Sequence, residues 1–345
     1  MKYLQPTLIR IHADKNLTPR TLRWGETKFS ISKTGASFRD GFSKQDLCFP
    51  LRTSRPLREP RKLSSAWIRL IAVVTFSTTC AVAEISITNR PFAGVEIFSE
   101  TRTDPPTRLF VAEIDLTQPR VHLHVSPGGA DPDGDGKWQT TLMPPTRIAQ
   151  RENFSLVVNG DFFLARGVND GEGTNAAFRA DQWSRVSGAA VSNGKVWSTS
   201  TNARPCLVVR NNGAVNIEII SRPPTNAIAV ISGNTMLVKN GVAVPHENKT
   251  RHPRTVVGLD TKRTRLVLMV VDGRKPGVAR GMNYDELAVE MLRLGCNDAF
   301  NLDGGGSSVM ALRDGSSESM KILNDPTDGR ERAVANVLGV TIDAE

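Results

Sequence analysis

The amino-acid sequence predicts an α+β fold, a mixed sheet with antiparallel hairpins and a few packed helices, in a single domain over residues 84–345. Three observations support this prediction. Short runs that alternate apolar and polar residues are typical of half-buried strands. Asn-Gly pairs between apolar runs indicate two-residue hairpin turns. One stretch near the C-terminus has helical spacing of its apolar residues together with start and stop signals, which favours a packed helix.

The first part of this domain shows strand patterns around one short helix. Residues 109–115 and 121–125 alternate apolar with polar side chains. A pair of prolines precedes a short predicted helix over residues 146–152, because proline fits the first helical turn. The apolar run 156–159 follows and predicts a buried strand.

The middle and the end of the domain differ in their turn chemistry. Asn-Gly pairs at Asn193, Asn212 and Asn240 predict antiparallel hairpins between about residues 185 and 245. The last hundred residues contain four apolar runs that predict buried strands, at 255–259, 266–271, 299–302 and 334–342. The predicted helix lies between the second and third of these runs. Asn283 is its expected N-cap, Glu286 completes a capping box, and Gly295 ends it.

The charge of the chain is concentrated in its first part. The whole sequence has 44 Lys and Arg against 35 Asp and Glu. Residues 1–83 hold 15 basic and 5 acidic residues, which leaves 29 basic and 30 acidic residues in 84–345. Because the domain itself has balanced charge and no basic stripe with interleaved aromatics, we expect no nucleic-acid partner.

The N-terminal part has the pattern of an export signal. Residues 1–64 are rich in polar and basic residues and are interpreted as a disordered extension or as sequence upstream of the true translation start. Residues 65–83 have flanking basic residues, an apolar centre and a small-x-small end, as signal peptides do. A membrane anchor is the alternative, but the uncharged run has only 14 residues, and about 20 are needed to span a bilayer.

We therefore expect a secreted or periplasmic protein with no membrane association after cleavage of the signal. Export would allow a disulfide between Cys206 and Cys296, the two cysteines that follow residue 83, although two free buried thiols are an equal alternative. The oligomeric state does not follow from the sequence.

The main chemical motif is the segment Asn301-Leu302-Asp303-Gly304-Gly305-Gly306-Ser307-Ser308. It follows an apolar strand directly. Three consecutive glycines indicate a turn where the backbone approaches another group closely, and free N–H groups in such a turn form an anion-binding nest. Ser307 and Ser308 add hydroxyl donors. The alternative is a tight turn without a ligand.

Three weaker motifs accompany this segment. Asn159 and Asp161 end another apolar strand, and ligands in sheets often lie beyond strand ends. Asp272 and Arg274 surround a glycine, in a motif where Arg274 would clamp a phosphate. Arg254 directly precedes the predicted strand 255–259, and its planar guanidinium suits phosphate. The alternative for the Asp161 and Asp272 motifs is a plain turn without a ligand. The alternative for the Arg254 segment is a solvated surface run.

One acidic segment suggests a metal ion. Asp131, Asp133 and Asp135 have the spacing that begins a calcium loop, but its twelfth position is Leu142 rather than Glu, so a complete EF-hand is excluded. Calcium is therefore the only cofactor the sequence suggests, and none is required. A zinc site at His122 and His124 lacks a third ligand in the nearby sequence.

Taken in order, the segments at Asn159, Arg254, Asp272, Glu286 and Asn301 resemble the phosphodiester glycosidase family. The resemblance covers about residues 95–343. It implies a single catalytic domain that hydrolyses the glycosidic C–O bond of a sugar-1-phosphodiester, of the N-acetylglucosamine type or in an envelope or exopolysaccharide glycan. The family pattern often has Ser-x-Gly before the helix, whereas this chain has Arg280-Gly281-Met282-Asn283.

On this interpretation Asp303, Asp161 and Arg254 are catalytic. The expected substrate-binding residues are Asn159, Asp272, Arg274, Asn301, Gly304, Gly305, Gly306, Ser307 and Ser308. The expected partner is a phosphorylated or phosphodiester-linked carbohydrate. An alternative is a non-catalytic secreted glycan-binding or exopolysaccharide-associated domain. A metal-dependent phosphodiesterase that cuts the P–O bond would need more His and Asp ligands than the sequence offers.

Overall fold

The computed structural model describes residues 84–87, 90–131, 136–171, 177–315, 317 and 319–343. The chain divides into two units, Met1–Val74 and Thr75–Glu345, and all the described residues belong to the second. The predicted boundaries at residues 64 and 83 lie outside the described residues and stay predictions. Among the described residues no helix has the length and apolar character needed to cross a membrane.

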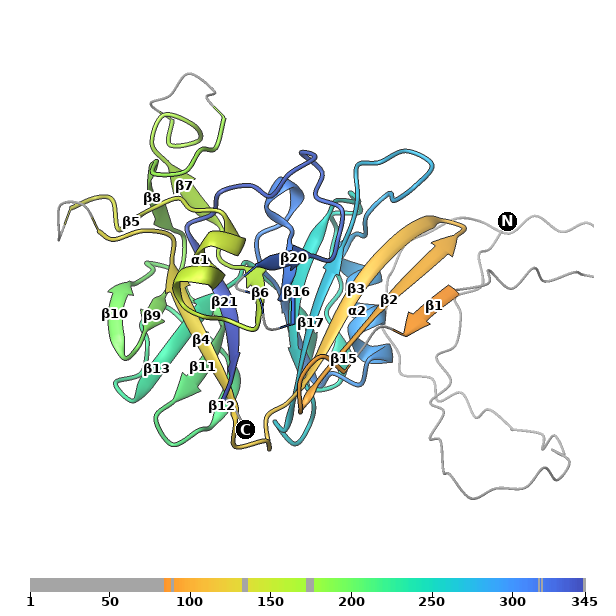
Figure 1. Cartoon of the computed structure of the whole chain (residues 1–345), viewed down its shortest axis with the longest axis horizontal. Helices are drawn as coiled ribbons and strands as arrows, with labels where there is room; N and C mark the ends of the chain where they lie inside the picture. Colours follow the sequence, from red (N-terminus) through yellow and green to blue (C-terminus); the bar gives the residue numbers. More distant parts are fainter. Residues whose placement is uncertain are drawn as a thin grey trace, which may run out of the picture. The chain divides into compact units, whose positions relative to one another are not determined.

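The fold is mostly β, so the α+β prediction is wrong. The described residues form 21 strands and only two α-helices, α1 (Pro145–Arg151) and α2 (Tyr284–Arg293) (Figure 1). Each described pair of neighbouring strands is antiparallel, so the sheets are not mixed. Some of these pairs are hairpins, such as β2 with β3 and β16 with β17, and others join strands that lie far apart in the sequence, such as β3 with β17 and β4 with β21.

The largest sheet has eight strands. Their spatial order is β1 (Glu84–Ile87), β2 (Val95–Thr103), β3 (Pro106–Asp115), β17 (Arg265–Val271), β16 (Arg254–Leu259), β18 (Asp298–Asn301), β14 (Thr235–Lys239) and β15 (Val242–Ala243). Helix α2 packs against one face of this sheet, where Leu287 and Met291 join Val256, Val267 and Met269 in one buried cluster. Because Val, Leu and Met side chains fill both faces of these strands, the sequences of the strands are continuous apolar runs.

Three further sheets complete the fold. One has the order β20 (Met320–Ile322), β19 (Met310–Arg313), β6 (Leu156–Asn159), β21 (Asn336–Ile342) and β4 (Val121–Pro127). The second has the order β10 (Lys195–Ser198), β9 (Ala190–Ser192), β13 (Ala227–Ser232), β11 (Arg204–Arg210) and β12 (Val215–Ile220). The smallest contains β5 (Thr140–Thr141), β8 (Trp183–Val186) and β7 (Phe163–Ala165).

The main core joins the three larger sheets. In Figure 1 strands β4, β6 and β21 lie between the eight-stranded sheet on one side and the β9–β13 sheet on the other. One cluster of buried residues contains Leu268 and Phe300 from the eight-stranded sheet, Leu338 from the sheet of β4, β6 and β21, and Ile231 from the β9–β13 sheet. Since burial of each such side chain contributes roughly 1.5–3 kcal/mol, this cluster holds the sheets together.

The turns and the C-terminal helix confirm the predictions made from their residues. Asn193 and Gly194 both have positive φ, 49° and 75°, as a two-residue hairpin turn requires. Asn240 and Gly241 repeat this geometry. At the start of α2 the Asn283 side chain accepts from Glu286 N, and the Glu286 side chain accepts from Asn283 N, both at 3.0 Å. This capping box fixes where α2 begins.

Candidate active site

The glycine loop, residues 303–308, follows the end of β18. Two backbone hydrogen bonds hold it, one to a residue next to β6 and one to a residue next to β16. Asp303 N donates to Gly160 O at 3.0 Å, just beyond β6. Gly305 N donates to Pro253 O at 2.9 Å, just before β16. Gly305, with φ 63°, begins a short 3₁₀ turn, Gly305–Ser307. The loop therefore occupies a fixed position where strands of two sheets end.

Each of the three glycines faces a different arginine. A Cβ on Gly304 would lie 3.7 Å from Arg254 Cδ and only 2.7 Å from Pro253 O. A Cβ on Gly305 would lie 3.2 Å from both terminal nitrogens of Arg274, and a Cβ on Gly306 would overlap the guanidinium of Arg332. The absence of side chains at Gly305 and Gly306 lets the guanidinium groups of Arg274 and Arg332 approach the loop, which explains the close approach that the triplet predicted.

Asp303 is the accessible carboxylate of this site. The residue is half-buried, and its Oδ1 accepts from Gly304 N at 2.8 Å. Burial raises the pKa of Asp303 to about 6, while Ser307, the Gly304 N–H, Arg332 and Arg254 oppose this rise. The carboxylate is therefore ionised at neutral pH but more basic than an ordinary Asp, as suits a base or a nucleophile.

Asp161 lies beside it but is only 2% exposed. Its Oδ1 accepts from Ser232 N at 2.7 Å and its Oδ2 accepts from Asn336 Nδ2 at 2.6 Å. Asn336 Oδ1 in turn accepts from Asp161 N. Burial raises the pKa of Asp161 to about 8, against the lowering effect of its two donors and Arg204, with Asp303 adding to the rise. Asp161 therefore connects the sheet of β6 and β21 with the sheet of β13.

Asn159 is likewise an internal clamp. It is fully buried at the end of β6, and its Nδ2 donates to Asp303 O at 2.8 Å. Its Oδ1 accepts from Thr255 Oγ1 at 2.6 Å and from Val309 N at 3.2 Å. Because both ends of the amide are occupied within the protein, Asn159 positions Asp303 and does not reach a ligand.

Arg254 is a buried cation without an ion pair in the described part of the chain. It is 6% exposed and donates to three neutral oxygens, Met282 O, Thr250 O and the Tyr284 hydroxyl, each at 3.3 Å. Its guanidinium also lies over the Tyr284 ring, 4.4 Å from the centroid. Burial lowers the pKa of Arg254. A buried charge held by long, neutral contacts is costly unless an anion completes its environment.

Arg274 is the exposed member of the group. Its φ of 59° is left-handed, an uncommon conformation for a non-glycine residue that often marks a functional position. Its Nη2 lies 3.4 Å from His252 Nδ1. Burial, Arg254 and Arg274 together lower the pKa of His252. The imidazole is therefore neutral at physiological pH and does not neutralise either arginine.

Asp272 is a structural anchor and lies apart from the accessible site. It is 2% exposed, and its Oδ1 accepts from Asn324 Nδ2 at 3.1 Å and from Asp325 N at 3.0 Å. Burial raises its pKa, against the effect of these donors. The sequence motif correctly identifies the turn that carries Arg274, but Asp272 holds the loop that follows β20.

Three buried polar atoms, two in the glycine loop and one at the end of β18, have no hydrogen-bond partner in the described residues. They are Ser307 Oγ, Ser308 Oγ and Asn301 Oδ1. Ser307 is still close enough to Asp303 to favour its ionised form. Asn301 Nδ2 donates to Asn234 Oδ1 at 3.1 Å and to Leu302 O at 2.6 Å. Buried polar groups normally find a partner, so these atoms are candidates for contact with substrate or water.

Sequence reasoning missed four residues around this site. The guanidinium of Arg332 occupies the space that a side chain on Gly306 would need, and it forms an ion pair with Asp328 at 2.8 Å. Arg204 lies near Asp161, and its Nε is buried without a partner. Asn336 and Tyr284 hold Asp161 and Arg254 respectively. Only Asn336 had a signal, as a polar residue that begins an apolar strand.

The metal and disulfide hypotheses have different outcomes. Asp133 and Asp135 lie outside the described residues, and Asp131 is exposed. Among the residues that are described, no three His, Cys, Asp or Glu side chains are grouped as a metal site would require. Cys206 and Cys296 are both buried and free, so the disulfide alternative is not realised.

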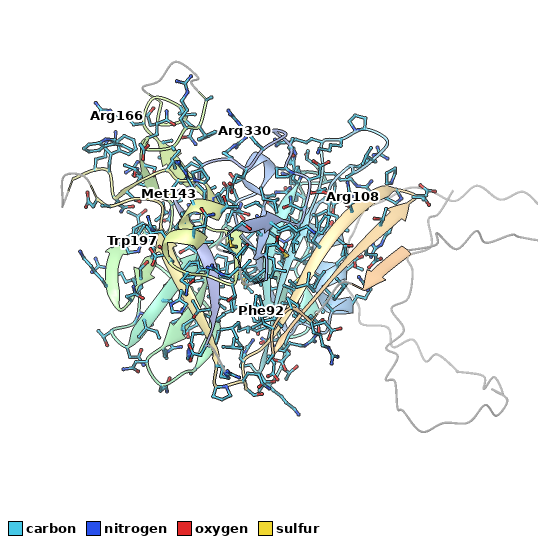
Figure 2. The ribbon with its side chains drawn as sticks, in the orientation of Figure 1. Phe92, Arg108, Met143, Arg166, Trp197 and Arg330 are labelled. Carbon is cyan, nitrogen blue, oxygen red and sulfur yellow. The ribbon has the colours of Figure 1, made fainter. Side chains whose placement is uncertain are left out.

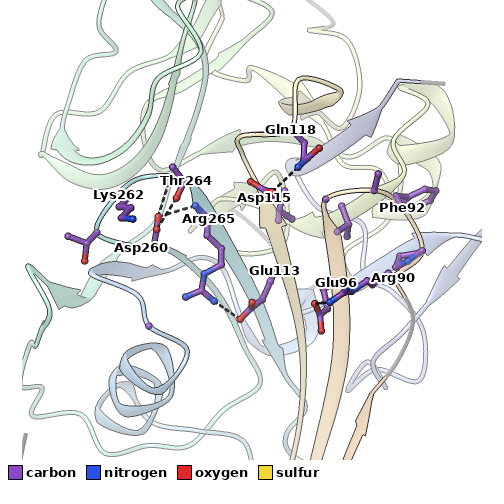
Figure 3. A pocket seen from close by; sticks show the side chains of 17 residues that line it. Arg90, Phe92, Glu96, Glu113, Asp115, Gln118, Asp260, Lys262, Thr264 and Arg265 are labelled. Carbon is purple, nitrogen blue, oxygen red and sulfur yellow. Dashed lines mark hydrogen bonds and ion pairs between the residues drawn. The ribbon is translucent and has the colours of Figure 1, made fainter. Parts of the chain in front are cut away.

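A cavity of about 1040 Å³ lies at the opposite ends of β16 and β17, where Asp260 and Arg265 contribute to its lining. None of the predicted site residues lines it. Figure 3 shows two ion pairs in it, Arg265 Nη1 with Glu113 at 2.7 Å and Arg90 with Glu96 at 3.3 Å. Asp115 and Asp260 accept hydrogen bonds from neighbouring neutral groups, so the described residues that line the cavity include no buried arginine without an ion pair such as Arg254.

An antiparallel β fold with an accessible carboxylate among guanidinium groups defines a protein suited to an anionic, phosphate-containing ligand. The model of the phosphodiester glycosidase family matches residues 152–341, more than half of the sequence. The chain belongs to the phosphodiester glycosidase family.

Two solved structures share the fold. The catalytic domain of zebrafish N-acetylglucosamine-1-phosphodiester α-N-acetylglucosaminidase, auto-inhibited by its pro-peptide, has a TM-score of 0.54 and 21% identity, over 76% of this chain and 88% of that one. A protein of Burkholderia pseudomallei K96243 has a TM-score of 0.51 and 16% identity, over 68% of this chain and 74% of that one. At these identities the likeness concerns the fold alone.

One curated relative aligns over a shorter stretch. The uncharacterized SPbeta prophage-derived protein YomE of Bacillus subtilis (strain 168) is 38% identical over 91 residues. The match spans 26% of this chain and 13% of that relative's length.

Proposed function

We propose that this protein hydrolyses the glycosidic C–O bond of a sugar-1-phosphodiester. The observation that carries the proposal is the glycine loop, which presents the Asp303 carboxylate while the guanidinium groups of Arg274 and Arg332 lie against its backbone and Arg254 opposes the rise in the pKa of Asp303 that burial causes. Membership of the phosphodiester glycosidase family supports the same reaction class. An N-acetylglucosamine-type sugar is the first candidate substrate.

The arginines would bind and stabilise the phosphate. A phosphodiester carries one negative charge, and the bond cleavage places a second on the departing phosphate monoester. In this proposal the charge develops between Arg254, which is buried, and Arg274, which is exposed beside Gly305, because positioned donors stabilise a charged transition state. Because a phosphate monoester is a good leaving group, the site needs little general-acid assistance.

Asp303 would act at the sugar carbon. The bond between C1 and the phosphate oxygen breaks, with its electron pair remaining on that oxygen. A water molecule supplies the hydroxyl group of the free sugar, and Asp303 either removes its proton or first forms a covalent bond to C1. Asp161 lacks access to substrate, so we assign it a positioning role beneath Asp303 in place of direct catalysis.

The closeness of Asp303, Asp161 and Arg254 supports an enzyme over the glycan-binding alternative. Asp303 N donates to Gly160 O, adjacent to Asp161, and Arg254 influences the pKa of Asp303. A binding domain has no need of a half-buried carboxylate beside a buried arginine that lacks an ion pair in the described residues.

The direct test is an assay of the purified full-length protein with α-N-acetylglucosamine-1-phosphodiesters and a panel of other sugar-1-phosphodiesters. Asp303→Asn removes the proposed reactive group, and Asp314→Asn is the matched control because Asp314 is an exposed carboxylate outside the site. We expect release of free sugar by the wild type and by Asp314→Asn but not by Asp303→Asn. Equal activity of all three proteins would remove Asp303 from the reaction.

Export and calcium binding are proposals with separate tests. Signal cleavage after residue 83 predicts a mature protein that begins at Glu84, which N-terminal sequencing of the exported product would check. A mature N-terminus well before residue 65 would contradict it. Calcium bound at Asp131, Asp133 and Asp135 predicts lower thermal stability or activity after chelation with EDTA, restored by added calcium.

A further inference from the structure

A second cavity adjoins the glycine loop. It has a volume of about 630 Å³ and is lined by Pro144 and by parts of the segments 177–180 and 328–333. Arg332 belongs to both places, because it lines the cavity while its guanidinium occupies the space that a side chain on Gly306 would need. Figure 2 shows Arg330, another lining residue, at the edge of the molecule opposite Phe92, which lines the larger cavity.

An aromatic ring forms one wall of this cavity. The Arg332 guanidinium lies 4.6 Å from the centroid of the Phe178 ring. Phe178 also contacts Phe163 edge to face, with 5.5 Å between the ring centroids. This stack fixes the position of Arg332 between the cavity and the loop, and it leaves an apolar surface for the carbon skeleton of a ligand.

The carboxylates that line the cavity have partners, whereas two of its arginines form no ion pair in the described residues. Its two carboxylates are already engaged, since Asp328 pairs with Arg332 at 2.8 Å and Glu331 accepts hydrogen bonds from the backbone and hydroxyl of Thr146. Arg179 and Arg330 are exposed, and neither forms an ion pair within the described residues. The cavity therefore offers two free guanidinium groups next to a site that already has its own arginines.

We propose that this cavity is a subsite for the alcohol part of the phosphodiester, and that this alcohol carries a second phosphate group. The inference rests on the proposed function. One phosphodiester needs only the arginines at the glycine loop, so Arg179 and Arg330 remain for a further anion. Planar guanidinium groups bind two phosphate oxygens at once, and the Phe178 ring packs against the carbon atoms that join the two phosphates.

Two matched substrates test the subsite. One is N-acetylglucosamine joined through its 1-phosphate to glycerol, and the other is the same compound with a phosphate on the far hydroxyl of the glycerol. We expect the wild type to have a higher kcat/KM for the doubly phosphorylated compound. In Arg179→Gln/Arg330→Gln the ratio of the two kcat/KM values falls by about tenfold or more, as loss of charged hydrogen bonds implies.

The control variant is Lys195→Gln/Lys262→Gln, which removes the same charge from two exposed residues that do not line the cavity. It is expected to keep the wild-type ratio. A ratio that falls equally in both double variants would show a general charge effect and overturn the subsite. An unchanged ratio in Arg179→Gln/Arg330→Gln would also overturn it.

A binding measurement separates this inference from the proposed reaction. Calorimetric titration of the Asp303→Asn variant with each compound gives a Kd without turnover. Tighter binding of the doubly phosphorylated compound, lost when Arg179→Gln/Arg330→Gln is added, supports the subsite even if the wild type hydrolyses neither compound. Equal Kd values for the two compounds contradict the subsite, whereas absence of hydrolysis alone contradicts only the proposed function.

Discussion

Arg102 and Arg254 have different partners, and the difference indicates their roles. Arg102 is partly exposed and donates to Glu290 at 2.6 Å and to Glu100 at 2.6 Å, and both carboxylates are almost fully buried. Arg254 is itself buried and has only three neutral acceptors at 3.3 Å. The structural arginine is thus paired with carboxylates. Arg254 lacks them, so its partner is expected to be a ligand.

This contrast predicts opposite effects of the same substitution. Arg254→Met removes an unpaired buried charge, so the free energy of unfolding is expected to stay near the wild-type value or to rise, while kcat/KM falls about a hundredfold or more. Arg102→Met leaves Glu100 and Glu290 with Arg293 as their remaining partner and is expected to cost about 1.5–3 kcal/mol of stability, as loss of hydrogen bonds between charged groups implies. Urea denaturation and steady-state kinetics measure both. Wild-type kcat/KM in Arg254→Met would exclude it from substrate binding.

The raised pKa of Asp303 predicts the pH dependence of the reaction. If the ionised carboxylate is the reactive form, kcat/KM rises with pH and levels off above an inflection near pH 6. An ordinary Asp would place this inflection near pH 4. A pH–rate profile between pH 4 and 8 checks the prediction, and a rate that falls as pH rises through 6 would require a protonated Asp303 instead.

At the scale of elements, the glycine loop explains why three glycines stand together. A Cβ on Gly306 would meet the movable ends of Arg332 and Asp328, whereas a Cβ on Gly304 would meet the backbone oxygen of Pro253 at 2.7 Å. The first clash is relieved by moving a side chain, and the second only by moving the backbone. Substitution of Gly306 is therefore expected to affect substrate binding, and substitution of Gly304 is expected to affect the stability of the fold.

Gly306→Ala is expected to displace Arg332, which raises KM about tenfold while the melting temperature changes little. Gly304→Ala is expected to lower the melting temperature. Thermal unfolding together with KM measurements distinguishes the two variants. If Gly306→Ala and Arg332→Gln both keep the wild-type KM, Arg332 has no part in substrate binding.

The local elements were predictable because their signals lie within a few residues. The capping box at Asn283 and the Asn-Gly turns at Asn193 and Asn240 need no distant partner. The fold class was not predictable in the same way. Apolar periodicity identifies a strand, but it does not give the direction of its neighbour, and every described neighbour proved antiparallel.

The candidate site was predictable only in part for the same reason. Asp303 and Asp161 follow apolar strands directly, a position that a sequence reveals. Their environments come from far along the chain: Asn336 is 175 residues from Asp161, and Arg332 follows a polar turn without any motif. The sequence therefore placed both carboxylates at strand ends but did not show that Asp161 is buried and Asp303 half-buried.

At the scale of the whole molecule, one end of three sheets is joined by polar contacts. Asn159 and Asn336 lie at strand ends of the sheet of β6 and β21, and Ser232 ends β13 of another sheet. Thr255 and Asn301 belong to the eight-stranded sheet. Asp161 is bonded to Ser232 and Asn336, so it connects two of these sheets. Its protonation state therefore affects the stability of the fold as well as the site.

The raised pKa of Asp161 gives this effect a sign. Between about pH 4 and pH 8 the folded protein holds a proton on Asp161 that the unfolded chain releases, so this group makes the free energy of unfolding fall as pH rises across that window. Asp161→Asn removes the contribution. Its stability relative to the wild type is expected to improve between pH 5 and pH 8 in urea denaturation, whatever its absolute value. Parallel pH profiles would contradict the raised pKa.

The central claim is that the protein breaks the bond between the sugar carbon and the phosphate oxygen at Asp303. Hydrolysis of an α-N-acetylglucosamine-1-phosphodiester in ¹⁸O-labelled water tests it most directly, with mass spectrometry of both products. Cleavage at carbon places the label in the free sugar and leaves the phosphate monoester unlabelled, and Asp303→Asn abolishes the reaction. Label in the phosphate would show cleavage of the P–O bond and contradict the assigned chemistry.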